Sequence, residues 1–520
     1  MTRKREHLWA ALVGVLSAMT ALAAAEVIAL FVAAASSPLL AVGSFVIDLV
    51  PGWFKSVVIA LFGTGDKVAL VVALGLLVLL LAIAVGIVEY RRPPFGAVLL
   101  GVVGAVATLA AITRANATIM WAIPAVGGAI VGIVVLRTAL DRLHSWSDAA
   151  RAATSNNRDA QRGTVTRRAF VLMTGVTGAV ALALGLGARA INATTTAVNA
   201  VREALTLPKP TTAAAVIPAG AELGIPGLAP IISANGTFYR IDTALTVPSI
   251  DASSWKLKIS GMVENPIEIG FDELLALPLT EHIVTLMCVS NEVGGALVGN
   301  ATWLGYPIRE LLKKAKPTSG ADMVLSRSYD GFTASTPLSV LQEEDRACLL
   351  AVGMNGEPLP LEHGFPVRMV VPGLYGYVSA TKWVVELHVT TFAQEASYWT
   401  QRGWSDHGPV KTSSRIDVPA SGTRVPVGTV AVAGVAWAQH TGIDHVEVRV
   451  DGGDWTMARL ADAISIDTWR QWVYQWEATS GNHTIEVRAT DSSGKTQSGT
   501  RVNVIPNGSE GWHSITVNVG

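Results

Sequence analysis

The chain has 520 residues, of which 50% are hydrophobic and 15% are charged, and its formal net charge is -1. This length predicts several domains, and the near-neutral charge without a basic stripe argues against nucleic-acid binding. With only two cysteines, Cys288 and Cys348, neither a disulfide framework nor a cysteine-based zinc site is available.

The first third of the chain carries the long apolar runs. Runs long enough to cross a bilayer as helices occupy residues 8–35, 68–88, 95–112, 119–136 and 169–191. The run over residues 38–62 is weaker because Asp48, Pro51, Gly52 and Lys55 interrupt it. The sequence therefore predicts an all-α transmembrane bundle over residues 1–191, placed in a lipid bilayer.

The positions of the arginines predict the topology of this bundle. Arg91 and Arg92 follow the second run, and a second basic loop follows the fourth run, with Arg137, Arg142, Arg151, Arg158, Arg162, Arg167 and Arg168. Basic loops tend to stay in the cytoplasm. Five spans, with 38–62 as an outer-surface or re-entrant segment, place both loops and the basic N-terminus there. Everything after residue 191 is then predicted to lie outside the cytoplasm.

Few residues in the bundle suggest chemistry. His7 is the only histidine in the first 140 residues, so we expect no haem held by two histidines. Glu26 lies within the first run, and a carboxylate in a membrane span is a candidate functional residue. We favour the simpler interpretation that it lies near the outer interface or pairs with a neighbouring helix. The bundle either only anchors the protein or also docks an electron partner.

Two further stretches precede the soluble part. The sequence Thr166-Arg-Arg-Ala-Phe-Val-Leu172 resembles a twin-arginine export signal. The lysine that usually follows the apolar pair of such a signal is missing, and the two arginines also fit as ordinary cytoplasmic anchors. Residues 192–235 are rich in Ala, Thr and Pro, which predicts an extended linker. From residue 236 the pattern changes to short β-like runs with turns, and the latter half of residues 303–313 reads as a short amphipathic helix.

Cys288 lies where an apolar, β-branched run from Val284 meets a short loop that ends at Gly295. A strand followed by such a loop presents a single thiol to a ligand. From this spacing alone the cysteine is a nucleophile, a ligand of a soft metal, or a small buried hydrophobe. Cys348 lies inside an apolar run and is predicted to belong to the core.

The segment Thr285-Leu-Met-Cys288-Val-Ser-Asn291 resembles the one that carries the molybdenum-ligating cysteine in the sulfite oxidase family of molybdopterin enzymes. The resemblance extends over about residues 236–520. It implies an α+β molybdopterin-binding catalytic domain over residues 236–410, with the molybdenum of the cofactor ligated by Cys288. A soft thiolate suits a metal that changes oxidation state while it moves an oxo group. This cofactor is inserted in the cytosol, so export of the folded domain fits the twin-arginine interpretation.

The same resemblance implies the residues that hold the cofactor. They come from four segments and comprise Tyr239, Arg240, Asp242, Ser326, Ser328, His363, Arg368, Ser379 and Lys382. Arg240 is also expected to orient an oxyanionic or S-oxide substrate, because a guanidinium group suits oxyanions. The gap between Ser379 and Lys382 is one residue longer than in the family, which leaves the contacts of this segment open.

Two departures from the family concern the substrate. Sulfite oxidases have arginines soon after the cysteine loop, but here Asn291 is followed by Glu292 and Val293. A carboxylate near that pocket repels a dianion such as sulfite. The active-site tyrosine of the family aligns with Trp404, which we therefore include among the catalytic residues with Cys288 and Arg240. The expected substrate is a small oxyanion or S-oxide, with electrons exchanged through an unidentified carrier.

Residues 411–520 predict a C-terminal all-β immunoglobulin-like sandwich. The range 443–450 ends in alternating apolar and polar residues and runs into the turn sequence Asp451-Gly-Gly-Asp454, and residues 483–490 repeat this strand-and-turn pattern. No cluster of catalytic residue types lies in this part. The resemblance implies a dimerisation domain, and hence a possible homodimer.

Together these features predict a membrane-anchored, extracytoplasmic molybdopterin oxidoreductase that transfers an oxygen atom. The direction of the oxygen transfer is open, since oxidation of small sulfur compounds and reduction of sulfoxides, including protein methionine sulfoxide, both fit these features. A metal-free binding or adhesion module on a membrane anchor is an alternative of another class. A transporter bundle with an appended domain is a third, which the few polar residues in the spans disfavour.

Overall fold

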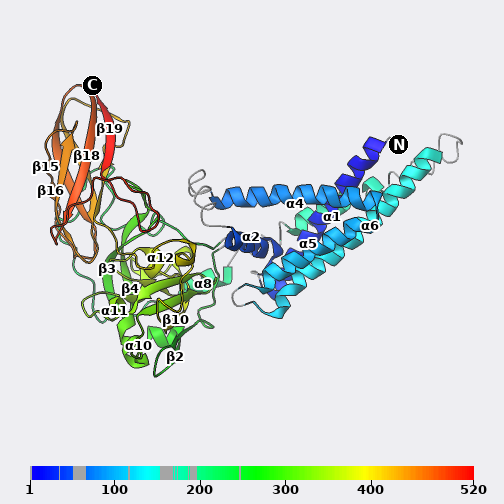
Figure 1. The fold of residues 1–520 in the computed structure, drawn as a ribbon, viewed down its shortest axis with the longest axis horizontal. Helices are drawn as coiled ribbons and strands as arrows, with labels where there is room; N and C mark the ends of the chain where they lie inside the picture. Colours follow the sequence, from blue (N-terminus) through cyan, green and yellow to red (C-terminus); the bar gives the residue numbers. More distant parts are fainter. Residues whose placement is uncertain are drawn as a thin grey trace. The chain divides into compact units, whose positions relative to one another are not determined.

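The structure is a computed structural model (Figure 1). It describes residues 3–33, 36–50, 66–114, 117–152, 168, 170–172, 174–185, 187, 196–244 and 247–520. The chain divides into two compact units. The first comprises Met1–Thr196 with Ala244–Thr246, and the second comprises Ala197–Thr243 with Val247–Gly520.

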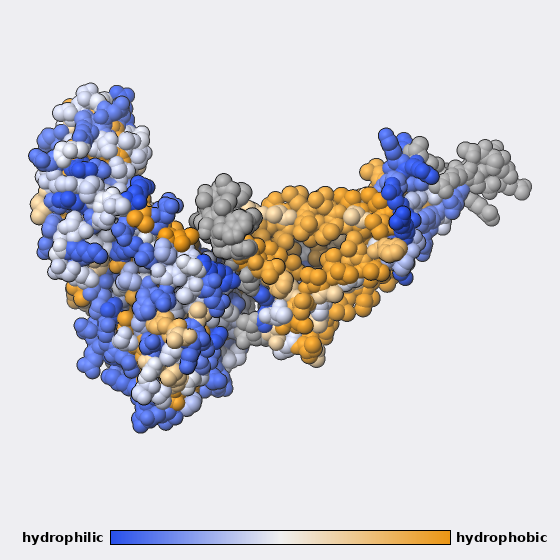
Figure 2. All heavy atoms as spheres, viewed as in Figure 1, coloured by the Kyte–Doolittle hydropathy of each residue, from blue (hydrophilic) through white to orange (hydrophobic). Residues whose placement is uncertain are grey.

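The first unit is helical. Its helices are α1 (Arg3–Val32), α2 (Pro38–Leu49), α4 (Asp66–Arg91), α5 (Phe95–Ile112) and α6 (Ala122–Ala152), the last preceded by the 3-10 turn η3 (Ile119–Trp121). Within the described residues, four helical stretches are long and apolar enough to cross a membrane: Arg3–Val32, Ala69–Arg91, Phe95–Ile112 and Ile119–Asp148. They correspond to the first four predicted spans. Figure 2 shows a broad hydrophobic surface over these helices, which is compatible with membrane anchoring.

The remaining predicted membrane segments are shorter or only partly described. Phe170–Gly185 is an apolar helix below the length of a span, and the last residues of the predicted span 169–191 lie outside the described residues. Arg167 of the twin-arginine sequence also lies outside them. Helix α2 has 12 residues and is therefore about 18 Å long, too short for a hydrocarbon core of about 30 Å. The predicted segment 38–62 continues beyond residue 50 into the undescribed part of the chain.

Glu26 is buried and pairs with a neighbouring helix. Its Oε1 accepts a hydrogen bond from the Ser37 hydroxyl at 2.5 Å, and Ser37 is the N-cap residue of α2. The Ser37 oxygen in turn accepts from the Leu40 amide, as an N-cap residue does. This agrees with the simpler of the two interpretations of Glu26.

Two glycines set the close approach of α1 and α4. A Cβ atom on Gly14 would collide with the backbone of Ala82 and Gly86, and one on Gly86 would collide with the backbone of Ala10 and Gly14. Small residues at such a crossing let the two backbones touch, which maximises van der Waals packing between the helices.

Replacing Gly86 by Leu is expected to force α1 and α4 apart and to cost about 1–3 kcal/mol of stability, as overpacking does. The matched control is Gly75→Leu on the same helix, because a Cβ on Gly75 meets nothing within 4 Å. The measurement is the apparent melting temperature of the full chain in detergent. Equal melting temperatures for the two variants would contradict the proposed packing.

The second unit begins with α8 (Thr196–Ala204) and a segment that the composition predicted as a linker. Its described part is packed on the folded unit instead of free. Thr212 pairs with Thr280 in a parallel bridge, Ala221 is fully buried, and the Asn300 side chain donates to the Ile231 carbonyl at 2.8 Å. Contacts of this kind satisfy backbone groups that neither a helix nor a strand pairs, and composition does not reveal them.

The central part of this unit is α+β, as predicted. One sheet has the strand order β2-β1-β10-β5-β6 and another has β3-β4-β7-β8, with β9 paired to β7. The strands are β1 (Lys256–Gly261), β2 (Ile267–Gly270), β3 (Thr280–Met287), β4 (Val298–Pro307), β5 (Met323–Ser328), β6 (Thr333–Pro337), β7 (Leu349–Met354), β8 (Glu357–Pro358), β9 (Arg368–Val370) and β10 (Val384–Thr390). The short helices are α9 (Phe271–Leu275), α10 (Ile308–Ala315), α11 (Leu338–Gln342) and α12 (Gly376–Ser379).

Local sequence accounts for two of these elements. Helix α10 buries Ile308, Leu311, Leu312 and Ala315, which lie on one face at helical spacing, and it is the amphipathic helix expected near residue 313. Strand β7 is buried along its whole length and carries the sequence that follows Cys348. Cys348 itself is 2% exposed, so the prediction of a core cysteine is confirmed.

The C-terminal part is the predicted β-sandwich. One sheet has the order β11-β13-β17-β16 and the other β12-β19-β18-β14-β15. Their strands are β11 (Ser413–Val418), β12 (Arg424–Val425), β13 (Gly428–Trp437), β14 (Ile443–Val450), β15 (Thr456–Met457), β16 (Arg459–Leu460), β17 (Arg470–Ala478), β18 (Gly481–Asp491) and β19 (His513–Val519). Alternate residues of β14 and β18, such as Val446, Val448 and Val487, fill the core together with Trp472.

Candidate active site

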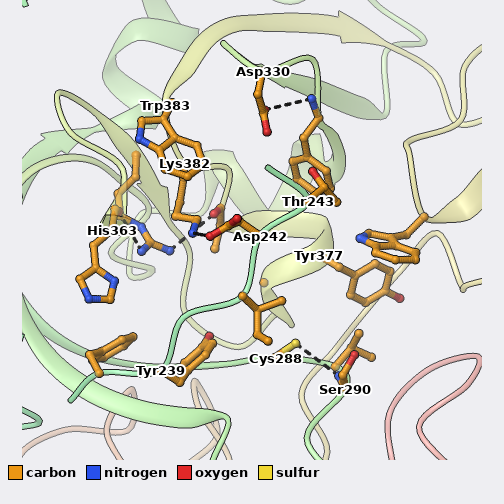
Figure 3. Close-up of a pocket in the computed structure, with 18 of the residues that line it drawn as sticks. Tyr239, Asp242, Thr243, Cys288, Ser290, Asp330, His363, Tyr377, Lys382 and Trp383 are labelled. Atoms are coloured by element: carbon orange, nitrogen blue, oxygen red, sulfur yellow. Dashed lines mark hydrogen bonds and ion pairs between the residues drawn. The ribbon is translucent and has the colours of Figure 1, made fainter. Parts of the chain in front are cut away.

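A pocket in the second unit gathers residues from segments far apart in the sequence. The space inside it is about 910 Å³ when the open mouth and the solvent in it are included. Its walls come from residues 238–243, the loop after β3, the turn after β5, the segment 363–383 and the segment 399–404. Figure 3 shows the sulfur of Cys288 at its base.

Cys288 is presented by the strand and loop that the sequence predicted. Strand β3 ends at Met287, and the Cys288 amide donates to the Leu297 carbonyl at 2.9 Å. The Cys288 carbonyl accepts from the Asn291 amide at 3.1 Å, and Sγ accepts from the Ser290 amide at 3.4 Å. Burial raises the pKa of the Cys288 thiol, while the Ser290 amide and the Lys382 charge lower it in part.

One half of the pocket is charged. The Lys382 ammonium donates to Asp242 Oδ2 at 2.8 Å and to the Glu362 carbonyl at 3.0 Å. Arg240 Nε donates to the same Asp242 oxygen at 3.0 Å, so one carboxylate balances two cations. Burial lowers the pKa of Lys382 to about 8, and the Asp242 carboxylate opposes this shift. Figure 3 places Lys382, Asp242 and His363 together on this side of the pocket.

Among the described residues, the hydrogen bonds of the buried cation Arg368 go to backbone carbonyls. Its guanidinium donates to the carbonyls of Met369, His363 and Ala380 at 3.3, 3.2 and 3.5 Å. It makes no ion pair with a carboxylate in the described part of the chain, and it lies 5.0 Å from the centre of the Trp303 ring. Burial lowers its pKa to about 10. A buried cation is costly without a counter-charge, so this half of the pocket suits an anion.

His363 lies at the end of the turn η4 (Leu361–His363) and is neutral at pH 7. Burial, with the nearby Arg368 charge, lowers its pKa to about 4. Its Nε2 is 3.0 Å from the Asn235 carbonyl oxygen, and because a carbonyl only accepts, Nε2 carries the proton. Nδ1 is then left as an acceptor. Gly364 follows with a φ of 114°, a left-handed conformation that favours glycine and turns the chain toward Arg368.

The other half of the pocket is aromatic. Phe332, Tyr377, Trp399 and Trp404 line it, and the Trp404 ring lies 5.9 Å from the rings of both Tyr377 and Trp399. The Tyr377 hydroxyl donates to the Ser405 carbonyl at 2.8 Å, which fixes its ring. No lysine or arginine lines this half, among the described residues.

The structure brings together most of the residues that the sequence singled out. Tyr239, Asp242, Cys288, His363, Arg368, Lys382 and Trp404 all line the pocket. The side chain of Arg240 is 43% exposed and is not among the lining residues, because its guanidinium is held by Asp242.

The three predicted serines are likewise not among the residues that line the pocket. Ser379 donates to the carbonyls of Leu374 and Tyr375, and Ser326 bonds the Thr381 hydroxyl at 2.7 Å. Ser328 is buried at the end of β5. Of the segment 379–382, Ala380 and Lys382 reach the pocket.

Sequence reasoning missed several lining residues, including Asp330, Tyr377, Trp383 and Trp399. Their positions in the sequence could have identified three of them as lining residues. Asp330 is in the turn after Ser328, Tyr377 lies two residues before Ser379, and Trp383 directly follows Lys382. Trp383 Nε1 donates to the Leu361 carbonyl at 2.9 Å, and its ring lies 4.7 Å from the Lys382 nitrogen.

Comparison with known proteins agrees with this geometry. Residues 244–399 match the oxidoreductase molybdopterin binding domain, and residues 413–487 match the bacterial Ig domain. Mitochondrial sulfite oxidase of Macaca fascicularis is 27% identical over 341 residues, which are 55% of this chain and 61% of that protein. The human mitochondrial sulfite oxidase is 26% identical over 343 residues, covering 55% and 62%. The second unit of this chain is therefore similar to the sulfite oxidases, and its residues 244–399 form an oxidoreductase molybdopterin binding domain.

Two further proteins are similar to parts of this chain. Nitrate reductase (NADH) of Solanum lycopersicum is 30% identical over 178 residues, which are 29% of this chain and 19% of that protein. The crystal structure of the sulfane dehydrogenase SoxCD from Paracoccus pantotrophus shares the fold, with a TM-score of 0.50 and 24% identity over 56% of this chain and 84% of that one. The chain spans less than two thirds of the length of the sulfite oxidases it matches.

Replacing Asp242 by Asn is expected to lower the pKa of Lys382 below about 8, because the opposing carboxylate is lost while burial and the charges of Arg368 and Arg240 remain. The neutral amine is the reactive form, so acetylation of Lys382 should begin at lower pH in the variant. Competitive labelling of the metal-free chain, read by peptide mass spectrometry, measures this.

Lys256 serves as the control in the same digest, since its exposed ammonium pairs with Glu268 and lies outside the pocket. Its labelling profile should not move. An unchanged profile for Lys382 would show that Asp242 does not set its protonation.

Proposed function

We propose that this chain is a membrane-anchored molybdenum oxidoreductase that transfers an oxygen atom to or from a small sulfur compound outside the cytoplasm. The observation that carries the proposal is the meeting of one soft thiol, Cys288, with the buried cations Arg368 and Lys382 in a single pocket. The match to a molybdopterin binding domain supports the cofactor, and the arginine-rich loops of the first unit support the side of the membrane.

The residues present fit a molybdopterin cofactor. Arg368 has no carboxylate partner among the described residues, and its fork suits a phosphate group. Lys382 adds a second donor, and Nδ1 of the neutral His363 can accept a hydrogen bond from a pterin N–H. The Cys288 thiol is a soft ligand, which must lose its proton to bind a metal.

Each of these residues then has a defined task. Cys288 would bind the molybdenum, Arg368 and Lys382 would bind the phosphate, and His363, Tyr239 and Asp242 would orient the pterin. Ser326 and Ser379 support the segment 379–382 from behind through hydrogen bonds, and Ser328 lies at the end of the strand that carries Ser326. When bound, the molybdenum cofactor supplies the two-electron oxygen chemistry that no side chain can supply.

The aromatic half of the pocket favours an uncharged substrate. Phe332, Tyr377, Trp399 and Trp404 offer apolar surface, and Arg240 is held away by Asp242. A dianion such as sulfite would lose its water there without gaining a cation. A neutral organic sulfoxide, or the thioether it forms, gains by burying its alkyl groups. We therefore favour the sulfoxide class over sulfite, with Trp404 as a substrate contact and an external carrier exchanging the electrons.

Replacing Cys288 by Ser is expected to abolish molybdenum binding and turnover, because an alcohol is a poor soft ligand. The matched control is Cys348→Ser, since Cys348 is buried away from the pocket and its sulfur donates to the Val340 carbonyl, a bond that a hydroxyl can keep. Molybdenum is measured by mass spectrometry of natively produced protein. Full metal content in the Cys288 variant would overturn the proposal.

A panel of sulfite, dimethyl sulfoxide and methionine sulfoxide with artificial donors and acceptors tests the substrate class. We expect kcat/KM for the sulfoxides to exceed that for sulfite by about tenfold, which corresponds to about 1.4 kcal/mol. Trp404→Arg should lower the ratio of kcat/KM for the sulfoxides to kcat/KM for sulfite, or bring it below one, because the arginine offers a cation to the dianion. Faster turnover of sulfite by the unmodified chain would contradict the assignment.

A further inference from the structure

The strand that leads to Cys288 has one edge that the segment around Thr212 covers near Thr280 and that the C-terminal sandwich covers near Thr285. Strand β3 is an edge strand that pairs with β4 on one side. On the other side, the Thr285 amide donates to the Asp467 carbonyl at 3.0 Å, and the Thr285 hydroxyl accepts from the Trp469 amide at 2.8 Å. Trp437 Nε1 reaches Met287 Sδ at 3.0 Å, one residue before the cysteine. Both tryptophans belong to the sandwich.

The sandwich also holds the loop after Cys288 at two carbonyls. The Ser509 hydroxyl donates to the Asn291 carbonyl at 2.7 Å. Arg415 Nη1 donates to the Gly295 carbonyl at 2.9 Å, and Asp417 accepts from Arg415 Nε at 2.6 Å, which fixes the guanidinium. These two donors lie in different parts of the sandwich sequence, and they hold the middle and the end of the same loop.

A third contact explains a glycine in this loop. Gly294 has a φ of 80°, a conformation that favours glycine, and a Cβ atom there would collide with the His513 ring. His513 begins β19, and its Nδ1 accepts a hydrogen bond from the Ile416 amide at 2.9 Å. The imidazole is therefore fixed by the sandwich and packs directly on the loop backbone.

We infer that the C-terminal sandwich positions the Cys288 thiol, with Ser509 and Arg415 as its positioning residues. The loop joins the paired ends of β3 and β4, and each carbonyl anchor from the sandwich removes some of the conformations that the loop could otherwise sample. A metal ligand has to be held within about 0.5 Å of its working position by surrounding groups that are themselves fixed. The sandwich supplies such groups for the cysteine loop. That the fixed atom is a metal ligand rests on the proposed function, whereas the fixation itself does not.

The first test measures the thiol without any cofactor. Full-length chain in detergent, produced in a host that makes no molybdopterin, is treated with a maleimide, and modification of Cys288 is followed by peptide mass spectrometry. Ser509→Ala and Arg415→Gln are each expected to speed the reaction of Cys288 about fivefold, the effect of losing one hydrogen bond. The buried Cys348 gives an internal reference whose rate should not change.

Two further variants make this test specific. Arg449→Gln is the matched control, because Arg449 pairs with Glu486 at 2.7 Å in the same sandwich and has no bond to the loop. Ser509→Thr keeps a hydroxyl and should restore the rate of the unmodified chain. Should Arg415→Gln fail to fold, Ser509→Ala decides alone, since it removes a single hydrogen bond. Rates equal to that of the unmodified chain in Ser509→Ala would overturn the inference.

The second test uses the molybdenum-loaded enzyme. Ser509→Ala is expected to shift the paramagnetic resonance signal of the metal and to lower kcat with little change in KM, whereas Arg449→Gln should change neither. Absence of molybdenum from the unmodified chain would overturn the proposed function and leave the thiol result standing. Normal metal content with an unchanged signal and unchanged thiol rates would overturn the positioning role alone.

Discussion

The burial of positive charge beside a thiol is the constraint on which this site depends. Lys382 is compensated by Asp242, which Arg240 shares, while Arg368 is surrounded by carbonyl oxygens. Carbonyl dipoles stabilise a guanidinium less than a carboxylate does, and burial lowers the pKa of Arg368 to about 10. A protein tolerates such a group where an anion completes the balance, which is why this half of the pocket suits a phosphate-bearing cofactor.

That constraint divides the pocket into a charged half and an aromatic half. The charged side chains come from residues 242, 368 and 382, with the neutral His363 beside them, and the aromatic half is formed by residues 332, 377, 399 and 404. Cys288 lies at the base, as Figure 3 shows. A cofactor bound by the cations leaves the aromatic wall for the substrate. The match to a molybdopterin binding domain agrees with the first half, and the aromatic residues of this chain form the second.

The C-terminal sandwich has a closer relation to this site than its distance in sequence indicates. Its tryptophans cover the free edge of β3, and Ser509, Arg415 and His513 contact the loop after Cys288. A module that looks catalytically inert from its sequence thus takes part in the geometry of the thiol. The edge of β3 would otherwise expose unpaired backbone groups.

The sequence by itself determined what depends on near neighbours: the apolar helices, the amphipathic α10, and the strand that leads to Cys288. Its motifs also indicated most of the residues that line the charged half. Only the tertiary structure decided that Arg240 turns to Asp242, that the predicted linker packs on Thr280, and that Tyr377 and Trp399 join the pocket. These outcomes follow from side-chain directions and pairings between distant segments, which hydropathy and spacing along one chain do not encode.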